Sequence, residues 1–158
     1  MACQGQEEGG MEAIIFCGIQ ASGKSSFYQE RFSNTHLRIN LDMLRTRRRE
    51  DLVLNACLEG GQRFVVDNTN PTGKDRAHYI KLAKASRFAV TGYFFEAELE
   101  DCLKRNGLRE GRSRVPDKAL DAASRKLQRP NLKEGFDELY IVKLMGEGFE
   151  VVKVESDA

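Results

Sequence analysis

The eight residues 18–25 read Gly-Ile-Gln-Ala-Ser-Gly-Lys-Ser, which is the spacing G-x-x-x-x-G-K-S. They follow the apolar run 13–17, typical of a buried strand, and lead into residues 24–32, which are predicted to be helical. Two glycines at this spacing let backbone amides line a polyphosphate, and the helix points its positive end toward the same anion. In this context the motif predicts a phosphate-binding loop (P-loop) that binds ATP or another nucleoside triphosphate. A glycine-rich turn without a ligand is the alternative.

Different roles are predicted for the side chains of this loop. Lys24 supplies a mobile cation for the terminal phosphates, and the hydroxyl of Ser25 is a candidate ligand of Mg²⁺. The residues expected to bind the nucleotide in this loop are Gly18, Gln20, Ala21, Ser22, Gly23, Lys24, Ser25 and Ser26.

The length and composition of the chain predict one domain with a hydrophobic core. The chain has 158 residues, of which 41% are hydrophobic and 31% charged. Residues 1–11 are rich in glycine and glutamate and lack the features of a signal peptide, so we expect a disordered lead-in to a folded domain over residues 12–158. No stretch approaches the roughly 18 apolar residues of a membrane span. The four cysteines show no C-x-x-C spacing, which favours reduced thiols in a cytoplasm over disulfides.

Strand and helix patterns alternate along the chain without internal repeats. Strands are predicted over 13–17, 36–40, 63–67, 88–95, 139–144 and 149–154, and helices over 24–32, 43–60 (with a break near Arg48), 75–86, 98–106 and 116–127. This order predicts an α/β fold, a parallel sheet of the P-loop NTPase type covered by helices on both faces. The last strand is expected at an exposed edge.

Two further strand ends carry residues suited to phosphoryl transfer. Asp67 follows the apolar residues 64–66, the pattern of a carboxylate that holds Mg²⁺ or one of its waters, although many strands end in an aspartate that only caps a turn. Asp42 follows the second strand, with Arg45 three residues later on the same face of a starting helix. Asp42 could accept the proton of an acceptor hydroxyl, and Arg45 could bind an incoming phosphate. A helix N-cap beside a solvated arginine is the alternative.

Basic residues gather between the predicted helices 98–106 and 116–127. Residues 104–114 hold five basic side chains against Glu110 and contain two glycines. This basic lid would place Arg105 and Arg109 on the nucleotide and exclude water, whereas the alternative is a solvated charged loop. His36 and His78 stand alone, and structural roles are expected for both.

Taken together, these motifs resemble the 5′-polynucleotide kinase family. The resemblance rests on residues 18–25, the stretch 38–45 with its Asp-x-x-Arg pair, the Asp-Asn-Thr-Asn-Pro loop at 67–71, the lid residues 104–109 and the Glu-Gly-Phe at 134–136. It implies that Asp42 is the general base, Arg45 an acceptor-phosphate ligand and Arg109 a lid arginine on the donor phosphates. Leu41 departs from the family, which carries an arginine there. The family's phosphatase or ligase domains have no counterpart in these residues.

Three functions remain open at this point. The first is transfer of the γ-phosphate of ATP to the 5′-hydroxyl end of a polynucleotide. The second is a kinase of a small hydroxylated metabolite, and the third is a nucleotide-dependent switch that binds a partner protein. A net charge of +1 excludes a strongly basic nucleic-acid protein. The Asp42–Arg45 pair favours the two kinases, because a switch needs no acceptor base.

Overall fold

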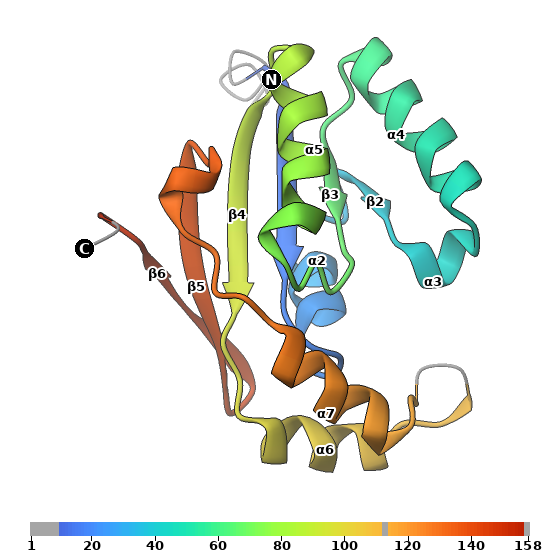
Figure 1. The fold of residues 1–158 in the computed structure, drawn as a ribbon, viewed down its shortest axis with the longest axis vertical. Helices are drawn as coiled ribbons and strands as arrows, with labels where there is room; N and C mark the ends of the chain where they lie inside the picture. Colours follow the sequence, from blue (N-terminus) through green and yellow to red (C-terminus); the bar gives the residue numbers. More distant parts are fainter. Residues whose placement is uncertain (1–9, 112–113, 157–158) are drawn as a thin grey trace.

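A computed structural model describes residues 10–111 and 114–156, which form a six-stranded sheet with helices on both faces (Figure 1). The strands are β1 (Glu12–Cys17), β2 (Leu37–Ile39), β3 (Phe64–Val66), β4 (Ala89–Phe95), β5 (Glu138–Met145) and β6 (Gly148–Lys153). Their order across the sheet is β2-β3-β1-β4-β5-β6. The predicted α/β fold is confirmed.

One strand departs from the parallel arrangement. β6 pairs with β5 in antiparallel register, while the other neighbours are all parallel. The turn between β5 and β6 is too short for the crossover that a parallel pair needs, and Gly146 takes a φ of 57° within it. β6 forms the outer edge, as expected.

The helices and turns between the strands are α2 (Lys24–Arg31), α3 (Leu41–Leu44), α4 (Arg47–Gly60), α5 (Gly73–Ala85), α6 (Leu99–Gly107), α7 (Asp117–Lys126) and the 3₁₀ turn η2 (Leu132–Glu134). Side chains alternate across β1, so that Ile15 packs with α4 and α5 while Phe16 packs with α2 on the opposite face. A third apolar cluster joins α6 and α7 to the P-loop through Ile19, Cys102 and Leu120. Helices therefore cover both faces and close the sheet at the end that carries the loop.

The helix predicted over residues 43–60 is two helices. Arg45 ends α3 with a φ of 78°, and Thr46 begins α4 by accepting a hydrogen bond from the amide of Arg49. The threonine competes for the backbone and fixes the break ahead of the expected position at Arg48. The apolar spacing of this stretch predicts Leu52, Leu54, Ala56, Cys57 and Leu58 as core positions. Leu54 and Cys57 are buried, whereas Leu52, which is 58% exposed, and Ala56, which is also exposed, are not.

Three remaining expectations concern the whole chain. Most of the predicted lead-in, residues 1–9, lies outside the described residues. No helix in the described ranges is long and apolar enough to cross a membrane. Cys17, Cys57 and Cys102 are buried free thiols.

Candidate active site

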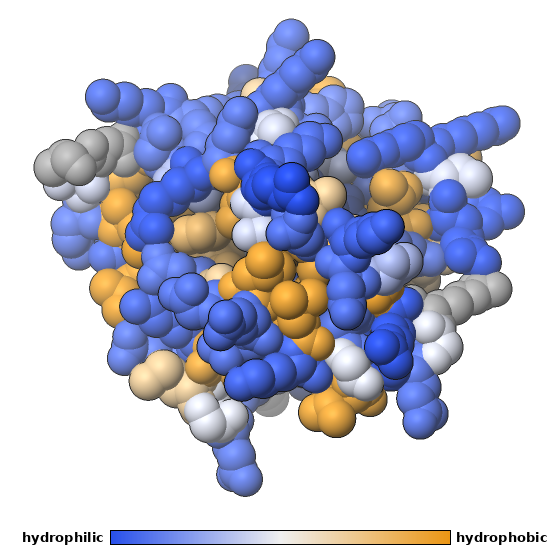
Figure 2. Space-filling model, turned by 60° about the horizontal axis from the view of Figure 1, so that its bottom comes forward, coloured by the Kyte–Doolittle hydropathy of each residue, from blue (hydrophilic) through white to orange (hydrophobic). Residues whose placement is uncertain are grey.

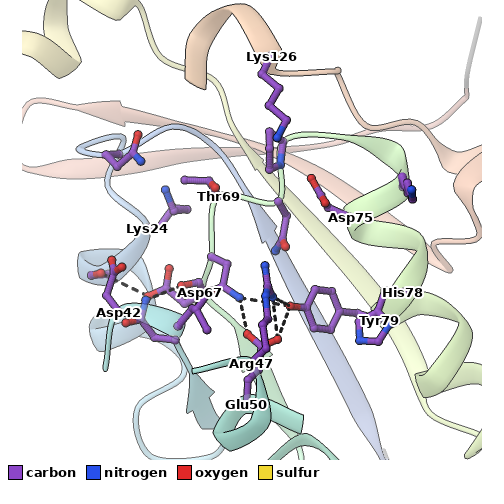
Figure 3. A pocket seen from close by; sticks show the side chains of 18 of the residues that line it. Lys24, Asp42, Arg47, Glu50, Asp67, Thr69, Asp75, His78, Tyr79 and Lys126 are labelled. Carbon is purple, nitrogen blue, oxygen red and sulfur yellow. Dashed lines mark hydrogen bonds and ion pairs between the residues drawn. The ribbon is translucent and has the colours of Figure 1, made fainter. Parts of the chain in front are cut away.

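The carboxyl ends of β1, β2 and β3 surround a pocket of about 710 Å³ (Figure 3). Its lining includes Lys24 and Ser25 after β1, Asp42 after β2, and Asp67 after β3. The loops after parallel strands all lie at one edge of a sheet, so residues far apart in sequence meet here. The pocket thus brings together the predicted phosphate loop and both predicted carboxylates.

The loop has the backbone that its glycines predict. Gly23 takes a φ of 103°, and Ala21 is also left-handed at 63°. A Cβ on Gly18 would lie 2.9 Å from the Cβ of Phe95, so only glycine fits there. The amide of Gly18 donates to the carbonyl of Thr69 over 3.0 Å, which joins the loop to the segment after β3.

The loop also holds polar atoms that lack protein partners. The side-chain oxygens Gln20 Oε1 and Ser22 Oγ are buried and accept no hydrogen bond from the described residues. Buried polar atoms are nearly always satisfied, so these two fit a loop that takes up a polar ligand. Ser26, by contrast, is exposed on the first turn of α2.

Lys24 folds back on its own loop. Its Nζ donates to the carbonyls of Gly18 (2.7 Å) and Ile19 (2.8 Å). Burial, which disfavours the charged form, lowers the pKa of Lys24 to about 8, and the nearby charge of Asp67 opposes part of that shift. An anionic ligand beside this amine would restore its charge.

Ser25 and Asp67 form an oxygen donor set of the kind Mg²⁺ prefers. The Ser25 hydroxyl lies 3.3 Å from Asp67 Oδ2, and the Asp67 side chain is 1% exposed. Arg38 of β2 pairs with the same oxygens, which shows that this position accepts a cation. The two residues therefore fit the predicted metal, which they would hold by hydroxyl and carboxylate oxygens.

The two members of the predicted Asp-x-x-Arg pair are placed differently. Asp42 stands in the first turn of α3, is exposed and lines the pocket, while the helix cap is made by Asn40. Arg45 ends α3 in a left-handed conformation and is absent from the pocket lining. The expectation that the two share one helical face is wrong, because α3 is only four residues long and Arg45 has left it.

A buried hydrogen-bond network around Glu50, at the wall of the pocket formed by α4 and α5, was not predicted from the sequence. Glu50, which is fully buried, accepts hydrogen bonds from Arg47 Nη1 (2.9 Å), Asn68 Nδ2 (2.9 Å) and the Tyr79 hydroxyl (2.8 Å). Figure 3 shows Arg47, Glu50 and Tyr79 meeting across α4 and α5. Burial and the bond to Glu50 raise the pKa of Tyr79 to about 12. The network holds the Arg47 guanidinium at the pocket wall.

Asn68 connects this network to the candidate base. Its Oδ1 accepts from the amide of Leu41 (2.8 Å), the residue before Asp42, while its Nδ2 reaches Glu50. One side chain therefore fixes the start of α3 relative to α4. Of the contacts in this network, the sequence could indicate only the Arg47–Glu50 pair, because residues three apart on a helix lie on the same face.

Buried hydrogen bonds hold the segment after β3 in place. Asn70 donates to the carbonyl of Phe16 (2.7 Å), and the buried Arg76 donates to the carbonyl of Asn70 (2.9 Å). Arg76 also makes two bonds to Glu134, at 2.7 and 3.1 Å. This bracing holds Asp67 and the residues beyond it against the P-loop strand.

The predicted lid follows α6 at one end of the molecule (Figure 1), whose face is mostly hydrophilic, with one apolar patch near the centre and others toward the rim (Figure 2). Arg109 lines the pocket. Arg105 instead donates from Nε to the carbonyl of Ala21 (2.6 Å), so its contact is with the loop backbone. Arg112 lies outside the described residues.

Several pocket residues were given no functional role by the motifs. His78, for which a structural role was expected, is exposed and lines the pocket. Lys74, Asp75 and Lys126 also line it, and Figure 3 shows Asp75 and Lys126 on the same side as His78. They come from the first turn of α5 and the end of α7, and no short motif marks them.

Comparisons with known proteins agree with this geometry. A family model described as AAA domain matches residues 14–130. The chain is 25% identical over 129 residues to the bifunctional polynucleotide phosphatase/kinase of Schizosaccharomyces pombe, a match that covers 79% of this chain and 32% of that protein. The chain spans about a third of the length of the curated relatives it matches.

Solved structures share the fold. Kti12 of Chaetomium thermophilum, in complex with ADP-AlF3, superposes with a TM-score of 0.63 at 13% identity, over 83% of this chain and 88% of that one. A gluconokinase from Sinorhizobium meliloti 1021 gives a TM-score of 0.56 at 18% identity, over 83% of this chain and 81% of the other. At such identities the likeness extends to the fold alone.

Proposed function

This chain belongs to the AAA domain family, and we propose that it is a P-loop kinase that transfers the γ-phosphate of ATP to the 5′-hydroxyl end of a polynucleotide. The resemblance to polynucleotide kinases that the motifs indicated is confirmed by the relatives that bear that name. Kinase-type phosphotransfer is the class that family and fold support; the acceptor is our proposal.

One observation carries the proposal. A single pocket is lined both by the P-loop residues Lys24 and Ser25 and by the carboxylate of Asp42. A protein that only binds nucleotide needs no second carboxylate besides Asp67 in the same pocket. A pocket with a donor side and an acceptor side is what group transfer between two substrates requires.

Each side chain then has a role. Lys24 and Arg109 would neutralise charge on the transferring phosphoryl group. Asp42 would accept the proton of the attacking hydroxyl. Ser25 and Asp67 would hold Mg²⁺, which when bound neutralises charge on the donor phosphates. Arg105 would keep the loop backbone in its nucleotide-binding shape through Ala21.

Arg47 supports an acceptor that carries its own phosphate. It presents a guanidinium on the acceptor side of the pocket, held there by Glu50 and Tyr79. A polynucleotide 5′ end has a phosphodiester next to the attacked hydroxyl, within the class of anions that arginine binds. We therefore assign to Arg47, which lines the pocket, the acceptor-phosphate contact that the family resemblance implies for Arg45.

A small hydroxylated metabolite is the second candidate acceptor. The pocket lining holds five carboxylates, namely Asp42, Glu50, Asp51, Asp67 and Asp75, against the five cations Lys24, Arg47, Lys74, Arg109 and Lys126. A surface that binds a polyanion is usually strongly basic, so this even balance favours a neutral polyol more than a long nucleic acid.

The test is a transfer assay with radiolabelled ATP. It offers 5′-hydroxyl DNA, 5′-hydroxyl RNA, 3′-phosphorylated nucleosides, free nucleosides and a panel of sugars and sugar acids. Phosphate-bearing acceptors should be labelled and free nucleosides labelled poorly. Arg47→Ala and Arg45→Ala are compared on the best acceptor, with Arg48→Ala as the control. Labelling of a neutral metabolite in preference to any oligonucleotide would refute the polynucleotide proposal, and hydrolysis without transfer to any acceptor would refute a kinase.

A further inference from the structure

Arg38 contacts both oxygens that the metal site would use. Its Nε donates to Asp67 Oδ2 over 2.8 Å, and its Nη2 donates to Ser25 Oγ over 3.0 Å. These are the carboxylate and the hydroxyl that fit Mg²⁺. Arg38 therefore forms an ion pair with the buried carboxylate of Asp67.

The guanidinium is held in this position by its surroundings. Arg38 lies in the middle of β2, the outer strand, next to Val65, whose side chain belongs to the face that α2 covers. Its guanidinium carbon lies 6.0 Å from the centre of the Tyr28 ring. The Tyr28 hydroxyl in turn donates to the carbonyl of His36 over 2.6 Å, which fixes the ring beside the strand.

We infer that Arg38 is a resident counter-cation of the metal site, which keeps free divalent metal out and gives up Ser25 and Asp67 only when metal arrives with the nucleotide. The inference deepens the proposed function, since it takes the metal to be the one used in phosphoryl transfer. It assigns a positioning role to a residue outside the P-loop and outside the Asp-x-x-Arg pair.

Arg38 and a metal ion would compete for the same lone pairs. A hydroxyl and a carboxylate oxygen that accept hydrogen bonds from a guanidinium cannot at the same time bind a metal ion along those directions. Leaving Asp67 without a cation would be costly, because its side chain is buried. Arg38 therefore stabilises the buried charge in the metal-free protein. The phosphates of the nucleotide can compensate the guanidinium once it moves away.

The experiment measures metal binding without any phosphoryl transfer. Mn²⁺ is titrated into nucleotide-free protein and the free ion is counted by electron paramagnetic resonance. Arg38→Gln should bind Mn²⁺ at least about tenfold more tightly than the parent, the scale of one charge-assisted hydrogen bond to a buried carboxylate. The control is Arg31→Gln, which removes an equal charge from α2, where Arg31 pairs with Glu30 and lies over Phe27. It should leave Mn²⁺ affinity unchanged.

Two further variants keep the result decisive. Adding Asp67→Asn to Arg38→Gln should abolish the gain in Mn²⁺ affinity. Arg38→Lys keeps the charge but lacks the two hydrogen-bonding nitrogens of the guanidinium fork, so it should bind Mn²⁺ with intermediate affinity. Arg38→Lys is also the test if the glutamine variant fails to fold. Unchanged or weaker Mn²⁺ binding on loss of the arginine fork, or a gain that persists without Asp67, would overturn the inference. Either result leaves the transfer assay unaffected, so the two proposals fail separately.

Discussion

Proton uptake by Lys24 provides a sensitive test of the P-loop chemistry. In the nucleotide-free protein burial lowers the pKa of this amine to about 8, from an ordinary value of 10.5. Triphosphate oxygens beside Nζ would bring the pKa back to its ordinary range, because an opposite charge favours the charged form. Above pH 8, nucleotide binding must therefore take up a proton.

The magnitude is set by these two values. At pH 9 about nine-tenths of the free protein has a neutral Lys24, so binding takes up about 0.9 proton and the affinity falls about tenfold relative to pH 7. At pH 7 the uptake is only about 0.1 proton. The sign depends on the direction of the shift: affinity decreases as the pH rises through the lowered pKa.

Isothermal titration calorimetry measures both quantities. A non-hydrolysable ATP analogue with Mg²⁺ is titrated at pH 7 and pH 9 in pairs of buffers that differ in ionisation enthalpy. Lys24→Arg is the control, because a guanidinium stays protonated throughout and should remove the pH step. Constant affinity with no proton uptake at pH 9 would refute the reasoning, since Lys24 would then be fully charged before the ligand arrives.

The same shift predicts how the stability of the free protein depends on pH. The folded-state pKa of Lys24 lies below the unfolded value, so the unfolded chain binds more protons between pH 8 and pH 10.5. The contribution of Lys24 is therefore destabilising below pH 8 and diminishes as the pH rises. Urea unfolding of the parent and of Lys24→Met across this range would show it, and parallel curves would contradict it.

Three other substitutions test separate parts of the structure. Asp42→Asn should reduce transfer by roughly 10²–10⁴-fold while ATP binds almost normally; an equal loss of ATP affinity would assign Asp42 to the nucleotide side. Tyr79→Phe removes one hydrogen bond from the buried Glu50 and should lower the free energy of unfolding by about 1–2 kcal/mol in urea titrations. Gly92→Ala would place a Cβ 2.7 Å from the Phe136 ring and should cost about 1–3 kcal/mol, whereas Gly60→Ala, with no atom within 4 Å of the new Cβ, should cost nothing.

Local pattern predicted the fold and the donor side of the site. The strand that precedes the P-loop, the loop itself and the position of Asp67 all depend on residues adjacent in sequence, and the parallel topology then brings them together. Asp42 could be placed at the pocket for the same reason, because it closely follows a strand.

Contacts between distant elements could not be predicted in this way. The network of Arg47, Glu50, Asn68 and Tyr79 joins residues up to 32 positions apart, and no periodicity records which of them face one another. Arg45 was misplaced because a left-handed backbone at a non-glycine residue has no sequence signature. The pairing of Arg38 with Asp67 likewise depends on β2 lying beside β3.

The central place of β1 in the sheet has a consequence for synthesis of the chain. β1 pairs with β3 on one side and with β4 on the other, and Phe94, the partner of Cys17, follows it by 77 residues. At about 5–20 residues per second, the ribosome needs about 4–15 s to make that stretch. During this time the apolar run of β1 has at least one edge without its partner strand, and both edges until β3 has been made. Substitutions that slow the pairing of β4 with β1 should therefore lower the fraction of chains that fold during translation. Their effect on the free energy of unfolding of the finished protein should be smaller.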